Sequence, residues 1–168
     1  MMAEIGLNWR KVGVNDQWFE RVLGKFKTSR TVLAHNVTEL QQSKVLQPGG
    51  VGLISTDEVT HRITSTGKDP TGLGRWCWTR FQGKNSIKVR TISVYRPCEA
   101  PGATTTYQQQ LRFLRHHNGE FEPREALYED LYMECADWIE EGDQLIIGID
   151  ANEDVRTGAT AEYFKALG

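Results

Sequence analysis

An apolar run at residues 145–149, rich in β-branched side chains and preceded by Gly142, predicts a strand that is buried on both faces. Two polar residues, Asp150 and Asn152, follow where the strand should give way to a loop. Open α/β proteins usually place their chemistry at such strand ends. Asp and Asn also suit a plain turn, because their side chains hydrogen-bond the neighbouring backbone. The pattern alone leaves both interpretations open.

Apolar and alternating segments earlier in the chain predict four more strands. Two of them flank the turn-forming residues 82–85 and therefore predict a hairpin. Tyr95 leaves the second hairpin strand, and Pro97 prevents its continuation inside a sheet. A tyrosine at such an exit either contacts a phosphate through its hydroxyl or caps the core. The four segments are residues 51–55, 61–66, 75–81 and 86–95.

Apolar residues at helical spacing predict four helices. Asn15 or Asp16 suits the N-cap of the first, and Pro123 and Gly142 bracket the third. The four helices are predicted at residues 14–30, 104–117, 123–141 and 161–167. The polar residues 31–48 predict a loop or a short helix. A glycine-rich cluster at 67–74 lacks the spacing of a phosphate-binding loop and leads into no helix, which excludes nucleotide binding through that motif.

Composition indicates one globular domain over residues 1–168, with 39% hydrophobic and 25% charged residues. The net charge of −2 hides an asymmetry. Through Arg115 there are 17 Lys and Arg against 8 Asp and Glu, and beyond it 3 against 14. A basic face on the first part would suit a polyanion, and the acidic part can supply metal ligands. The bland alternative is that most of these acids form the solvated face of one helix.

Three cysteines, Cys77, Cys98 and Cys135, form an odd set without metal-ligand spacing. This pattern predicts reduced thiols and an intracellular setting, either nuclear or cytoplasmic. The first residues lack the basic and apolar regions of a signal peptide, and no apolar run is long enough for a membrane span. No obligate protein partner is evident.

The order of these motifs resembles the endonuclease/exonuclease/phosphatase superfamily, the DNase I-like proteins. The resemblance rests on an early acid, an apolar Gly-Gly-Val-Gly-Leu-Ile strand, a strand that ends in Tyr-Arg-Pro, and an Asp-Ala-Asn sequence after the apolar run. These motifs are Glu4, residues 49–54, residues 95–97 and residues 150–152. The superfamily includes apurinic endonucleases and the endonuclease modules of non-LTR retrotransposons. Within it, the chain looks most like the retroelement type.

The resemblance implies a role for each matching residue. Glu4 would bind Mg²⁺ or Mn²⁺, hard cations that prefer carboxylate oxygen. Tyr95 would contact the scissile phosphate, and Asp150 would orient or deprotonate the attacking water. Asn152 would bind phosphate oxygens and stabilise developing charge. The further substrate-binding candidates are Arg96, Asn8 and Arg75.

The chain also departs from the family pattern. Family members begin with a strand that bears an asparagine, and they end with further strands that bear an aspartate and an Asp-His pair. Here Glu4 lies near the start, and His116 and His117 precede Asp150, so neither histidine matches by position. The resemblance therefore implies an α/β fold, a partial two-sheet sandwich of the DNase I-like type that lacks the first and last strands. Loss of the Asp-His pair would reduce or abolish activity.

Three functions remain open at this point. The first is metal-dependent hydrolysis of phosphodiesters, with DNA as the substrate. The basic and aromatic stretch at 75–96 favours it, because Arg and Lys bind phosphates and aromatic rings stack on bases. The second keeps the fold but acts on a small phosphoester or a lipid headgroup. The third is a non-catalytic module that binds nucleic acid or another partner.

Overall fold

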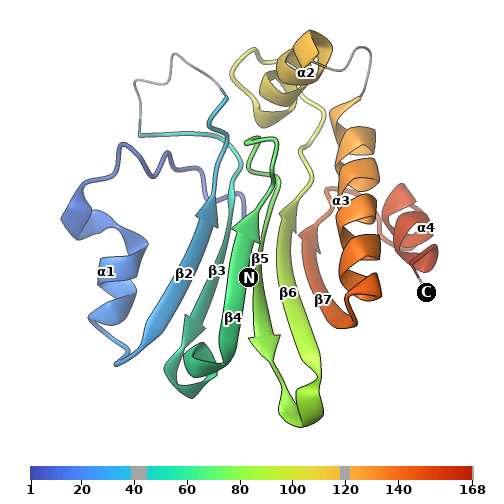
Figure 1. Ribbon diagram of the computed structural model, residues 1–168. Coiled ribbons are helices and arrows are strands. Elements are labelled where there is room, and N and C mark those ends of the chain that lie inside the picture. The colour runs from blue at the N-terminus through green and yellow to red at the C-terminus, as the bar shows by residue number, and fades with distance from the viewer. Residues whose placement is uncertain (39–44, 118–121, 168) are drawn as a thin grey trace.

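Two sheets and four α-helices make up the computed structural model, which describes residues 1–38, 45–117 and 122–167 (Figure 1). The three-stranded sheet has the order β1-β3-β2, with β1 at Met2–Ala3, β2 at Ser29–Ala34 and β3 at Val51–Thr56. The four-stranded sheet has the order β4-β5-β6-β7, with β4 at Ile63–Lys68, β5 at Trp76–Gln82, β6 at Lys88–Tyr95 and β7 at Asp143–Asp150. The helices are α1 (Trp18–Leu23), α2 (Thr106–His117), α3 (Pro123–Glu140) and α4 (Ala159–Lys165). Short 3₁₀ helices lie at Val14–Asp16, Asp57–Arg62 and Lys84–Ser86.

The predicted hairpin is confirmed, since β5 and β6 pair antiparallel from Trp76 opposite Val94 to Gln82 opposite Lys88. β7 then adds to β6 in parallel. Parallel neighbours need a long crossover, and α2 and α3 supply it. This connection brings the carboxyl ends of β6 and β7 to the same edge of the sheet.

The two sheets pack face to face around a small apolar core. Period-two alternation along the strands turns one set of side chains towards this inner space. The buried residues of the inner core are Val32, Ala34, Val51, Leu53, Cys77 and Tyr95. Tyr95 is the last residue of β6, so the core reaches the end of the sandwich where the strand stops.

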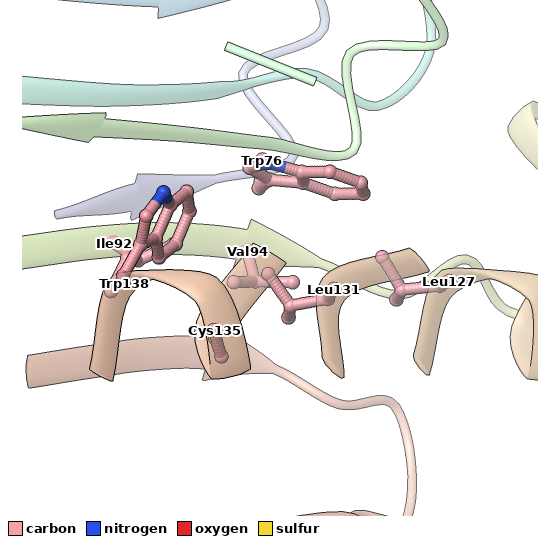
Figure 2. Close-up of a cluster of buried hydrophobic side chains, with 7 residues drawn as sticks. All are labelled: Trp76, Ile92, Val94, Leu127, Leu131, Cys135 and Trp138. Atoms are coloured by element: carbon pink, nitrogen blue, oxygen red, sulfur yellow. The ribbon is translucent and has the colours of Figure 1, made fainter. Parts of the chain in front are cut away.

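A second core joins the outer face of the four-stranded sheet to α3 (Figure 2). Leu127, Leu131, Cys135 and Trp138 repeat at helical spacing and form the predicted apolar stripe of α3. They pack on Trp76, Ile92 and Val94 of β5 and β6. The helix begins where the Glu122 carboxylate accepts hydrogen bonds from the N–H groups of Arg124 and Glu125, with Pro123 in the first turn.

Three local predictions are wrong. The first helix is short and ends at Leu23, whereas the pattern extended it to residue 30. Residues 31–34, predicted as part of a loop or a short helix, belong to β2, and residues 39–44 of the same predicted segment lie outside the described residues. β7 is an edge strand, with Ile146 50% exposed, and is therefore not buried on both faces.

The predicted α/β class is confirmed as a mixed fold with two open sheets of three and four strands. The three cysteines are free thiols. Burial raises the pKa of Cys77 and of Cys135 to about 12, so both stay protonated at neutral pH. Within the described part of the chain, no helix is long and apolar enough to cross a membrane.

Candidate active site

Strands from both sheets end at the upper edge of the sandwich in Figure 1, where β2, β4, β6 and β7 all point towards α2. In the four-stranded sheet, Tyr95 at the end of β6 lies opposite Asp150 at the end of β7. The N–H of Arg96 donates a hydrogen bond of 2.9 Å to the carbonyl oxygen of Asp150 and continues this pairing by one residue. The parallel register therefore brings together Tyr95 and Asp150, which are 55 positions apart in the chain.

The three-stranded sheet places the carboxylate of Glu4 beside Tyr95. β1 lies over β6, because the Met2 N–H donates to the Ser93 hydroxyl at 3.2 Å and that hydroxyl donates to the Met2 carbonyl at 2.8 Å. Glu4 follows β1 directly, and its carboxylate oxygen Oε1 accepts a hydrogen bond of 3.2 Å from the Tyr95 hydroxyl. Glu4 has a φ of 52°, in the left-handed region that a residue with a side chain rarely adopts. Such backbone outliers are frequent at functional sites.

Tyr95 is 4% exposed, and its environment fixes its protonation state. Burial raises the pKa of its hydroxyl, and the negative charge and hydrogen bond of Glu4 raise it further, with smaller effects from Cys98 and Asp150. Tyr95 therefore stays protonated throughout the physiological range. It can donate a hydrogen bond to a phosphate oxygen, but it cannot serve as a base.

Asn152 is fixed by its neighbours on the loop that follows β7. Its side-chain nitrogen Nδ2 donates a hydrogen bond of 2.7 Å to the main-chain carbonyl oxygen of Arg96. Its main-chain carbonyl oxygen accepts a hydrogen bond of 3.3 Å from the Arg124 guanidinium. It has a φ of 49°, again in the left-handed region. No other hydrogen bond of this side chain is formed with the described residues, so one amide hydrogen and the amide oxygen are available to a ligand. Asp150 is half-buried, and none of the described residues donates a hydrogen bond to its carboxylate.

Glu153 organises this loop and was not singled out from the sequence. It forms an ion pair of 2.6 Å with Arg96 and accepts hydrogen bonds from the Thr160 N–H and hydroxyl and from the Tyr128 hydroxyl. Burial opposes ionisation of Glu153, but the hydrogen bonds from Thr160 and the charge of Arg96 outweigh it and lower the pKa. The carboxylate thus ties the loop to α3 and α4. Its position beside Asn152 was the only available signal in the sequence.

Arg96 was predicted to bind substrate, and the structure places it inside the protein. Its guanidinium donates to the Ala151 carbonyl at 3.1 Å as well as to Glu153, and it lies 4.9 Å from the ring centre of Tyr128. Only 6% of the residue is exposed. These contacts make Arg96 a support for the loop, and they do not present it to a ligand.

Arg75 and Asn8 also lie away from open surface. Arg75 is fully buried and pairs with Asp69 at 2.8 Å and with Asp130 at 2.7 Å. Asn8 is 5% exposed, and its side-chain oxygen accepts a hydrogen bond of 3.1 Å from the Arg10 N–H in a turn. A direct substrate contact by the buried side chains of Arg75, Arg96 or Asn8 does not agree with these positions. The site that the structure brings together is Glu4, Tyr95, Asp150 and Asn152, and we call it the Glu4–Asp150 site.

The donor groups of the Glu4–Asp150 site suit a hard divalent cation. Mg²⁺ usually takes one or two protein carboxylates and completes its shell with water and substrate phosphate oxygens. Glu4 and Asp150 can provide two carboxylates, both close enough to Tyr95 to affect its pKa. Among residues 1–38, 45–117 and 122–167, no group of three or more His, Cys, Asp and Glu gathers in a way that could hold a metal by itself. A cation here would therefore depend on water and substrate for most of its ligands.

Comparisons of the chain with protein-family models, with curated proteins and with solved structures give no match.

Proposed function

We propose that this chain is a metal-dependent phosphodiesterase domain of the DNase I-like type, with DNA as its substrate and retroelement endonucleases as its nearest functional counterparts. The observation that supports this proposal most strongly is the hydrogen bond between Tyr95 and Glu4 beside Asp150. Three residues from distant parts of the chain, selected by sequence motif alone, converge at one end of the sandwich. A chance match of short motifs gives no reason for such convergence.

The proposed chemistry assigns one task to each side chain. Asp150 orients a water molecule and accepts its proton as the water attacks the phosphorus in line with the leaving oxygen; the bond between phosphorus and that oxygen breaks, and the leaving oxygen takes a proton from solvent. The Tyr95 hydroxyl would release Glu4 to the cation and turn its one hydrogen to a phosphate oxygen, and the Asn152 amide donates to another; both stabilise the charge that develops there. Glu4 would hold the Mg²⁺ or Mn²⁺ ion, which supplies further neutralisation of phosphate charge when it is bound.

Nicking of supercoiled plasmid by the purified chain tests this proposal. We expect nicking with Mg²⁺ or Mn²⁺ that stops when EDTA is added and when Asp150→Ala is introduced. Asp154→Ala is the matched control, because Asp154 lies on the same loop and its carboxylate pairs with the exposed Arg156 at 2.7 Å. Absence of nicking from a folded wild-type chain, or equal nicking by the Asp150→Ala variant, would contradict the proposal.

A further inference from the structure

A cavity of about 570 Å³ lies next to the three-stranded sheet, at the end of the sandwich that holds the Glu4–Asp150 site. Its wall includes Trp9 and Arg10 from the segment after β1, His35 from the end of β2, and Lys68 from the end of β4. We call it the Arg10–Lys68 cavity. Its volume falls within the usual range for small-molecule sites in proteins.

The charge of this cavity is positive. Arg10 and Lys68 are exposed, and no carboxylate of the described residues forms an ion pair with either of them. Asp69 also belongs to the wall, but its carboxylate is fully buried and accepts hydrogen bonds from the Arg75 guanidinium at 2.8 and 3.1 Å. Arg75, which also pairs with Asp130, therefore offsets part of the negative charge of Asp69, and the two exposed cations leave the wall with a positive balance that can attract an anion.

His35 shares the cavity wall with both cations. Burial, together with the smaller effects of the positive charges of Lys68 and Arg10, lowers the pKa of its imidazole to about 4. At neutral pH the imidazole is uncharged and can both donate and accept a hydrogen bond.

Trp9 adds an aromatic wall to the cavity. The residue is 8% exposed and packs on Trp18 with ring centres 5.4 Å apart. Its indole nitrogen is buried and has no hydrogen-bond partner among the described residues, so it does not face the cavity as a donor. Trp9 therefore contributes apolar surface to this wall.

The cavity and the Glu4–Asp150 site are joined by a short piece of chain. Six peptide units separate Glu4 from Arg10, and a fully extended segment of that length spans at most about 20 Å. Phosphates along one strand of DNA are spaced by about 3.4 Å of helix axis. One polynucleotide can therefore reach both places, whereas a small phosphoester can occupy only one.

We propose that the Arg10–Lys68 cavity is a second phosphate-binding subsite, which takes a phosphate of a polynucleotide whose scissile bond lies at the Glu4–Asp150 site. This inference rests on the proposed function and adds to it a second contact with the DNA strand, away from the scissile bond. Arg10 and Lys68 bind the phosphate, His35 hydrogen-bonds it or the neighbouring sugar, and Trp9 supplies an apolar wall.

The double variant Arg10→Ala/Lys68→Ala tests the subsite directly. Binding of a fluorescent DNA oligonucleotide is measured by anisotropy in EDTA at several salt concentrations, so that no cleavage interferes. We expect affinity to fall about tenfold or more and the slope of log affinity against log salt to become shallower by about 1 to 2. The matched control is Arg62→Ala/Lys84→Ala, one exposed arginine and one exposed lysine at the opposite end of the sandwich. Equal affinity and equal salt slope in the wild type and the cavity variant would overturn the proposal.

The imidazole of His35 offers a second readout in the wild-type chain. Its NMR pH titration is recorded alone, with inorganic phosphate, with a mononucleotide and with the oligonucleotide at the same phosphate concentration. We expect the oligonucleotide to raise the pKa from about 4 and the smaller anions to leave it nearly unchanged. A mononucleotide or inorganic phosphate that shifts it equally would overturn the assignment to a polynucleotide.

The subsite and the proposed function can fail separately. If wild-type protein binds DNA through the cavity but does not nick plasmid, the proposed function is wrong and the polynucleotide subsite stands as a binding site. If wild-type protein nicks plasmid and the Arg10→Ala/Lys68→Ala variant binds and nicks equally well, the subsite is wrong and the proposed function stands.

Discussion

The hydroxyl of Tyr95 and the carboxylate of Glu4 meet at 3.2 Å, although one residue ends a strand of the four-stranded sheet and the other follows a strand of the three-stranded sheet. The contact therefore closes one end of the sandwich across both layers. It also brings the Glu4 carboxylate to the side of the sandwich where Asp150 lies opposite Tyr95 in the parallel pair of strands.

Replacing Tyr95 by Phe removes the donor and keeps the ring. We expect cleavage to slow by about 10²-fold, the usual cost of losing one preorganised donor to a developing oxyanion. The free energy of unfolding should fall by only about 1 kcal/mol, since a single hydrogen bond to a surface acid is lost. Single-turnover cleavage and urea unfolding measure the two effects. A variant that loses activity only in proportion to its stability would argue for a packing role.

Replacing Glu153 by Gln should test whether this carboxylate positions the loop. The change leaves the buried Arg96 without its counter-charge, so we expect a loss of about 3 kcal/mol in stability. We also expect kcat to fall by about 10²-fold through misplacement of Asn152, while DNA affinity stays close to that of the wild type. Asp154→Asn, on the same loop, is the control. Unchanged kcat in a folded Glu153→Gln variant would exclude a positioning role.

Asp143 gives a prediction about pH. Its side chain is fully buried at the start of β7, with hydrogen bonds of 2.7 Å from Arg80 and 2.9 Å from Arg90. Burial opposes ionisation of Asp143, but the hydrogen bonds and charges of the two arginines outweigh it and lower the pKa. The folded pKa then lies below the unfolded value of about 3.9, so the stabilisation is present above about pH 4 and is lost as the pH falls further.

Asp143→Asn should therefore lower the unfolding free energy by about 3 kcal/mol at pH 7, because the buried Arg90 and the half-buried Arg80 lose their closest carboxylate and keep only the exposed Glu141 at 3.2 Å. The difference from the wild type should shrink between pH 4 and pH 2. Urea unfolding at a series of pH values measures it. A difference that stays constant over this range would mean that the charge of Asp143 contributes little.

Arg75 pairs with two acids that differ in exposure to solvent. Asp69 is fully buried, whereas the side chain of Asp130 is 45% exposed. We expect Asp69→Asn to cost about 3 kcal/mol or more, because it leaves a buried arginine poorly compensated. Asp130→Ala should cost less than about 1 kcal/mol, as surface ion pairs do. Thermal unfolding of both variants gives the comparison, and equal losses would contradict the buried role of Asp69.

Periodic features of the sequence predicted much of the fold. The apolar stripe of α3 and the alternation of β5 and β6 depend on local spacing, which is visible in one sequence. The first helix was overextended because Phe26 keeps the helical spacing, although the chain turns after Gly24 towards β2. β7 was expected to be buried on both faces because its apolar run does not reveal how many strands lie beside it.

The candidate site was predicted less evenly. Short motifs in the sequence predict Glu4, Tyr95, Asp150 and Asn152 as site residues, and the parallel register of β6 and β7 places Tyr95 next to Asp150. The buried arginines were misread as substrate contacts. Asp130 lies 55 positions from its partner Arg75, and Glu153 lies 57 positions from its partner Arg96. A local sequence pattern does not predict ion pairs over such separations.

The left-handed backbone at Glu4 and Asn152 lowers the stability of the folded protein. Glycine adopts that conformation without steric cost, so glycine at position 4 would relax the local strain. Glycine at position 152 would relax it too but would lose the hydrogen bond of 2.7 Å from Asn152 to the Arg96 carbonyl oxygen. A variant library selected for heat resistance alone should therefore drift towards glycine at position 4. The selected variants would be more stable and would lack the carboxylate that the proposed chemistry assigns to the cation.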